Sequence, residues 1–147
     1  MTSAAPTIKA ALVAELQALY AAPVVVSYGH PGTDVEDDMV AVLDIRSTQE
    51  VATLSPMRKR EETLDIDVVI SCFRGGGPEA QQVATERAYA LLALLESWVQ
   101  GDGYTIGGTV RLGLLSRYDL AEATDPDILA LGRVAEITAT LTCSVRI

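Results

Sequence analysis

Residues 61–100 constrain the fold more than any other part of the sequence, because a strand pattern leads through a glycine-rich turn into an amphipathic helix. Residues 61–73 alternate between apolar and polar side chains, which is typical of a strand with one face in water. Glycine and proline fill positions 75–78, and apolar side chains then recur at helical spacing through residues 79–100. An apolar sheet face and an apolar helix stripe most simply bury each other, so the sequence predicts a helix packed on a sheet.

The rest of the chain supplies further segments of both kinds. The predicted elements are a helix over 6–20, strands over 24–29 and 39–45, the strand and helix described above, and strands over 109–118 and 132–147. Residues 49–54 are a candidate extension of the second strand, and residues 119–127 are expected to form an acidic connector. Short connections between strands favour antiparallel pairing. We therefore expect one α+β domain over residues 1–147, with a mostly antiparallel sheet of four to five strands and two helices packed on one face.

The composition is that of a globular protein, with 49% hydrophobic and 21% charged residues. The formal net charge of -9 argues against a surface that grips nucleic acid by neutralising its phosphates. Cys72 and Cys143 fall on the predicted inward side of strands, so buried free thiols are expected rather than a disulfide framework. The sequence shows neither a basic leader followed by an apolar block nor an apolar run of membrane-spanning length. We expect a soluble cytosolic protein without membrane contact.

Two groups of polar residues are candidates for a metal or acid–base site. His30 lies in a Gly-His-Pro-Gly turn close to the acidic residues of 34–38, but a single histidine without a cysteine or second histidine is a weak signal for a transition metal. A solvated turn is the favoured interpretation. Asp65 and Asp67 share one face of a strand and are spaced to hold a cation or to act as an acid–base pair. Polar residues are expected there in any case, because they alternate with apolar ones, so a solvated sheet face is favoured.

The glycine run at 75–77 invites a phosphate-binding loop, since it lies between a strand and a helix. It lacks the spaced glycines of a dinucleotide site and the Lys-Ser/Thr pair of a P-loop. Pro78 at the first helical position explains the run as a strand exit and a helix start. With one histidine in the chain, the serines and cysteines have no evident base to activate them. We therefore expect neither an enzyme nor a cofactor or metal.

Several features, in their order along the chain, resemble one protein family. They are the leading amphipathic helix, the short valine-rich strand, an R-x-R-E-E-T run that opens the long strand, the helix ERAYALLALLESWV, the glycine-rich turn before residue 109, and Gly132-Arg133-Val134-Ala135 at the start of the last strand. Together they resemble the tail terminator (tail completion) proteins of long-tailed bacteriophages, especially those of actinobacterial hosts and related prophages. The resemblance covers nearly the whole chain.

The resemblance implies a structural protein of the virion tail or neck, assembled in the host cytoplasm. Such proteins form a ring, usually a hexamer, that caps the tail tube, ends its polymerisation and joins it to the head-side connector. The implied partners are other copies of the chain, the tail tube protein and the connector or neck protein. DNA passes through the ring without specific binding, and the family has no catalytic residues to carry over.

Charge clustering adds two hypotheses about surfaces. An exposed acidic loop, expected to face the lumen or a partner, comprises Asp34, Glu36, Asp37 and Asp38. A contact with a neighbouring subunit or with the tail tube is expected at Arg58, Lys59, Arg60, Glu61 and Glu62. Two other interpretations stay open. One is another neck or head–tail adaptor or a tail-tube subunit, and the other is a small ferredoxin-like α+β homodimer that acts as an enzyme or binds a ligand.

Overall fold

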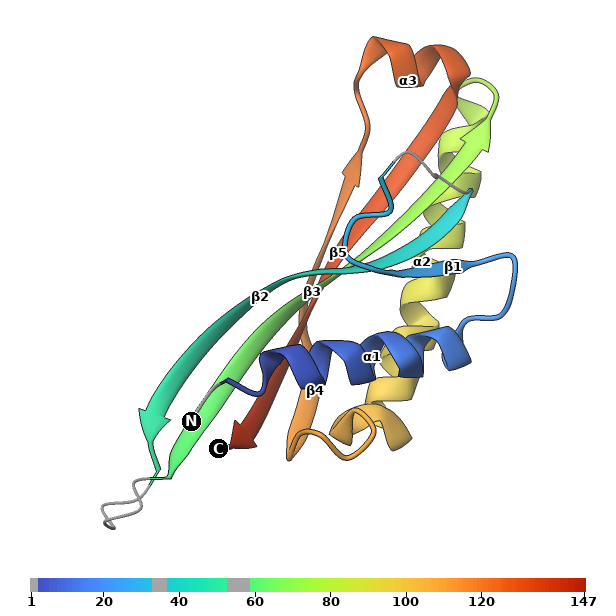
Figure 1. Cartoon of the computed structure of the whole chain (residues 1–147). Helices are drawn as coiled ribbons and strands as arrows, with labels where there is room; N and C mark the ends of the chain where they lie inside the picture. Colours follow the sequence, from blue (N-terminus) through green and yellow to red (C-terminus); the bar gives the residue numbers. More distant parts are fainter. Residues whose placement is uncertain (1–2, 33–36, 53–58) are drawn as a thin grey trace.

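The computed structural model describes residues 3–32, 37–52 and 59–147, and Figure 1 labels its elements. Along the chain they are α1 (Ala5–Leu19), β1 (Val25–Tyr28), β2 (Asp38–Val51), β3 (Arg60–Gly75), α2 (Glu79–Gln100), the 3-10 helix η1 (Asp102–Thr105), β4 (Leu112–Glu122), α3 (Pro126–Leu131) and β5 (Gly132–Arg146). The strands form one five-stranded sheet in the order β1-β2-β3-β5-β4. The α+β class predicted from the sequence is confirmed.

β3 and β5 form the centre of the sheet and set its register. They pair antiparallel from Glu61 opposite Arg146 to Gly75 opposite Gly132. The buried side chains of one face are Leu64, Ile66, Val68, Ile70 and Cys72 of β3 and Ala135, Ile137, Ala139, Leu141 and Cys143 of β5. These side chains share one core cluster with the apolar stripes of α1 and α2, so both helices pack on the same face.

β1 departs from the predicted antiparallel pattern. It pairs parallel to β2, with Val25 opposite Met39 and Tyr28 opposite Val42. β1 has four residues, so it spans only about 13 Å at roughly 3.3 Å per residue. The connection from Tyr28 to Asp38 is long enough to return the chain over that distance. A strand this short therefore pairs parallel without a helical crossover.

The remaining differences concern element boundaries. β2 continues to Val51 past an irregularity between Val42 and Ile45, which confirms part of the predicted extension, while residues 53–54 lie outside the described residues. β4 begins at Leu112 rather than at 109, because η1 and the turn after it occupy the preceding residues. The predicted acidic connector contains α3, and the Asp125 carboxylate caps this helix by accepting a hydrogen bond from the backbone N–H of Asp127 at 2.9 Å.

Cys72 and Cys143 are both free and buried, which confirms the state predicted for them. They lie on the core face of the two central strands. Burial raises the pKa of each thiol to about 12. Both thiols are therefore protonated and poorly nucleophilic near neutral pH.

Candidate interaction surfaces

Asp38 lies at the centre of an ion-pair cluster that joins three elements. It is the first residue of β2 and is only 5% exposed. Its Oδ1 accepts a hydrogen bond from Arg74 Nη1 of β3 at 2.8 Å, and its Oδ2 accepts one from Arg87 Nε of α2 at 3.0 Å. Burial alone would raise the pKa of Asp38, but the hydrogen bonds and charges of the two arginines outweigh it and lower the pKa. Asp38 therefore stays ionised and ties the start of β2 to β3 and α2.

The structure corrects one member of the predicted acidic loop and places another. Asp38 is not an exposed loop residue, because two arginines distant in the sequence enclose its carboxylate. Asp37 is exposed, and its carbonyl accepts a hydrogen bond from the backbone N–H of Phe73 at 2.7 Å. Asp34 and Glu36 lie outside the described residues. Asp37 is thus the described residue of this group whose side chain is available to a partner.

His30 lies in an exposed turn, which agrees with the solvated turn predicted for it. Its Nδ1 accepts a hydrogen bond from the backbone N–H of Gly32 at 2.9 Å, which stabilises the turn. Within residues 3–32, 37–52 and 59–147, His, Cys, Asp and Glu side chains form no group suited to a metal ion.

The described part of the predicted contact, residues 59–62, lies at the end where β2 and β3 project beyond the helices (Figure 1). Arg58 is outside the described residues, whereas Lys59 and Arg60 are exposed. The backbone of Arg60 exchanges two hydrogen bonds with Ile147, at 3.0 and 2.9 Å. Ile147 is therefore fixed beside Arg60 at the start of β3, and the Arg60 side chain donates a hydrogen bond to Gln49 Oε1 at 3.2 Å.

Glu61 and Glu62 have different surroundings, although both belong to the predicted contact. Glu61 forms ion pairs with Arg111 at 3.0 Å and with Arg146 at 3.5 Å. Both arginine side chains are about half exposed, so these pairs contribute little to stability in water but remain accessible to a partner. Glu61 lies on the polar face of the sheet, together with the ladder of polar residues described below.

Glu62 corrects the prediction, since it is 0% exposed and unavailable for an intersubunit contact. Its Oε1 accepts a hydrogen bond from the backbone N–H of Ala4 at 2.9 Å, and its Oε2 accepts one from Gln49 Nε2 at 3.1 Å. Burial would raise the pKa of Glu62, but hydrogen bonds from Ser3, Gln49 and Ala4 outweigh it and lower the pKa. The carboxylate thus anchors the start of α1, where the helix dipole favours a negative charge.

The helix-free face of the sheet carries a hydrogen-bonded ladder around Asp65 and Asp67. Arg46 pairs with both oxygens of Asp67, at 2.9 and 3.0 Å. The hydroxyls of Thr140 and Thr142 donate to Asp67 at 3.2 Å and to Asp65 at 2.7 Å, respectively. The hydrogen bonds of Arg46 lower the pKa of Asp67. The two carboxylates are thus bound to neighbouring strands, which agrees with a polar sheet face better than with a cation or acid–base site.

The glycine turn after β3 offers its amide groups to the chain itself. Glu79, the first residue of α2, accepts a hydrogen bond from the backbone N–H of Gly77 at 3.2 Å. Its own backbone N–H and that of Gly77 lower the pKa of the Glu79 carboxyl. A carboxylate therefore occupies the position at which a phosphate would bind, and the strand-exit interpretation of the glycines fits this geometry.

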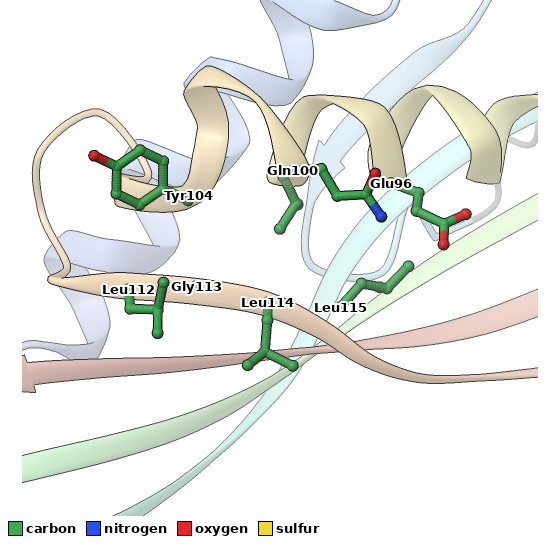
Figure 2. Close-up of a pocket in the computed structure, with 8 residues that line it drawn as sticks. Glu96, Gln100, Tyr104, Leu112, Gly113, Leu114 and Leu115 are labelled. Atoms are coloured by element: carbon green, nitrogen blue, oxygen red, sulfur yellow. The ribbon is translucent and has the colours of Figure 1, made fainter.

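An open groove of about 340 Å³ lies between the end of α2 and β4. It is lined by Glu96, Val99, Gln100, Tyr104 and residues 112–115. Figure 2 shows Leu115 directed toward α2, whereas Leu112 and Leu114 point to the other side of the strand. The lining is mainly apolar, with one carboxylate and one amide from α2, and offers a surface for contact rather than an array of reactive groups.

No protein-family model matches the chain, and no curated protein matches it. In the part of the chain that the structure describes, no helix is long and apolar enough to cross a membrane.

Proposed function

We propose that the chain is a structural protein of a phage tail that assembles into a ring, six-fold in the manner of the family it resembles, and caps the tail tube. The proposal rests on the sequence resemblance and on one structural observation. The sheet ends in two different edge strands, β1 and β4, and both carry exposed large apolar side chains. A head-to-tail ring requires two different surfaces on one chain that are complementary to each other.

The charge of the chain supports passage of DNA without binding. The net charge is -9, and the helix-free face carries Asp65 beside the ion pair of Asp67 with Arg46. An acidic surface repels the phosphate backbone and keeps DNA from adsorbing. The exposed Lys59 and Arg60 supply an opposite charge at the end of the β2–β3 arm, where we place the contact with a neighbouring subunit or the tail tube.

The direct experiment is arrest of tube growth. The tail tube protein of the same phage is polymerised alone and with the purified chain, and tube lengths and ends are examined by electron microscopy. We expect shorter tubes with a ring at one end. Tubes that lengthen equally in both samples, with no added density at either end, would refute the capping function.

The groove between α2 and β4 is the observation that favours a second candidate, a ligand-binding homodimer. Its volume of about 340 Å³ falls at the lower end of the range of small-molecule sites, roughly 300–1,000 Å³. A strict dimer that binds a small molecule in this groove would replace the ring proposal. A head–tail adaptor or tube subunit would instead assemble as a ring without arresting tube growth.

A further inference from the structure

The exposed apolar side chains of the described strands are concentrated at the two edges of the sheet. They are Val25 and Tyr28 of β1, Val51 at the end of β2, and Leu112, Leu114, Tyr118 and Leu120 of β4. The central strands β3 and β5 contribute none among the described residues. β1 covers only Met39–Val42 of β2, so Val51 also lies at an open edge. A further strand can pair with the open backbone of an edge strand, over four residues at β1 and eleven at β4.

Tyr28 and Tyr118 are the two ends of one row of residues across the whole sheet. Tyr28 is paired with Val42, Val42 with Val68, Val68 with Ala139, and Ala139 with Tyr118. The three residues between the tyrosines are all buried in the core. Residues opposite each other on neighbouring strands project from the same face, so both tyrosines project from the face that carries the helices. The Lys9 ammonium group of α1 lies 4.4 Å from the centre of the Tyr28 ring, which agrees with this placement.

The strand directions allow the two edges to join. β4 runs antiparallel to β5, β5 to β3, and β3 to β2, while β1 runs parallel to β2. β4 therefore runs opposite to β1. When a second copy is placed beside the first in the same orientation, its β1 meets β4 as an antiparallel neighbour, and the helices of both copies lie on one side.

We infer that copies of this chain associate head to tail, with β4 of one copy pairing antiparallel with β1 of the next and Tyr118 meeting Tyr28. The contact continues the sheet from subunit to subunit. A cross-strand aromatic pair adds to the stability that the backbone hydrogen bonds give such a ladder. This contact rests on the proposed ring and would be the contact between its subunits. The partner is a second copy of the chain.

Pairing of β4 with β4 of a second copy is the main rival arrangement. It buries Tyr118 and Leu120 but leaves Val25 and Tyr28 of both copies in water, where they are 40% and 58% exposed. Head-to-tail pairing covers both edges. A row of such subunits can also close into a ring. Six five-stranded sheets at about 4.8 Å per strand form a ring with a diameter of roughly 45 Å before strand tilt is included.

Cysteine cross-linking tests this contact. Tyr28→Cys and Tyr118→Cys chains are co-expressed with different tags and treated with a short bismaleimide, while the native cysteines are protected by burial. We expect cross-linked dimers that contain both tags, and little product from either variant alone. The matched control is Leu94→Cys, since Leu94 has the same 47% exposure as Tyr118 but lies on the outer side of α2. Each variant is first checked for folding by circular dichroism.

Two results would overturn the inference. One is efficient cross-linking of Tyr118→Cys with itself, which indicates two-fold pairing of β4. The other is a mixed product no more abundant than that of Leu94→Cys with Tyr28→Cys. The tube-growth assay distinguishes failure of this inference from failure of the proposed function. If the chain arrests tube growth but Tyr28 and Tyr118 do not cross-link, only the contact is refuted. If the two positions cross-link but the tubes keep growing, only the capping role is refuted.

Discussion

Replacing Asp38 by Asn should lower the free energy of unfolding by about 2 kcal/mol at neutral pH, since a hydrogen bond to a charged group contributes roughly 1.5–3 kcal/mol. The substitution keeps the shape of the side chain but removes the charge that faces Arg74 and Arg87. The arginine side chains are 28% and 37% exposed, so water partly solvates their charges when the carboxylate is lost. The expected cost therefore lies below the roughly 3–5 kcal/mol of a fully buried broken pair.

The effect of Asp38→Asn should depend on pH with a definite sign. Burial raises the pKa of Asp38, but the two arginines lower it by more than burial raises it. The folded-state pKa therefore lies below the unfolded value of about 3.9. The carboxylate thus contributes its full stabilisation above the unfolded pKa and loses it as the pH falls through the folded pKa. The difference between the native chain and the variant should be constant from neutral pH to about pH 5 and shrink below about pH 4.

Urea unfolding followed by circular dichroism, at one protein concentration and several pH values, measures this difference. Asp37→Asn is the matched control, because it removes the neighbouring carboxylate from an exposed position and should change stability by no more than about 0.5 kcal/mol. Equal effects of the two substitutions would refute the role assigned to the Asp38 cluster. So would an Asp38→Asn effect that persists unchanged at pH 2.

Three further predictions concern the core. Cys72 and Cys143 should react with a thiol reagent only as fast as the chain unfolds, because both are buried with pKa values raised to about 12. Rapid labelling of the folded chain would contradict their burial. Leu141→Ala should cost about 3 kcal/mol in urea unfolding, since Leu141 is 0% exposed and its truncation leaves a cavity. Gly132→Ala should lower the free energy of unfolding by roughly 1–3 kcal/mol, because a Cβ there meets the Arg74 carbonyl and the Phe73 ring. An unchanged stability would show that β3 and β5 separate more easily than their pairing suggests.

The central strands and the long helix were predictable because their determinants are local. Alternation over 61–73 and 132–147 sets which side chains of β3 and β5 face the core, and one register then satisfies both strands. The apolar spacing of residues 79–100 likewise predicts α2 with its observed bounds. In each case the pattern lies within a single element and requires no knowledge of its neighbours.

The candidate surfaces were less predictable because they depend on contacts between distant residues. Asp38 resembles its acidic neighbours in sequence, yet its partners Arg74 and Arg87 lie 36 and 49 residues away. Glu62 continues an exposed charged run in sequence, but the alternation of β3 turns its side chain to the core face, where it meets Ala4. That alternation was the one available signal, since Glu62 shares the parity of Leu64 and Ile66. The row from Tyr28 to Tyr118 requires the strand order and register, which no single segment contains.

The central claim is that the chain closes into a ring through two different sheet edges. Native mass spectrometry of the full chain near neutral pH tests it most directly, with Tyr118→Lys as the edge variant and Leu94→Lys as the exposure-matched control. We expect one closed oligomer, a hexamer by the family resemblance, that persists in the Leu94→Lys chain and dissociates in the Tyr118→Lys chain. A strict dimer, or an oligomer that Tyr118→Lys leaves intact, would contradict it.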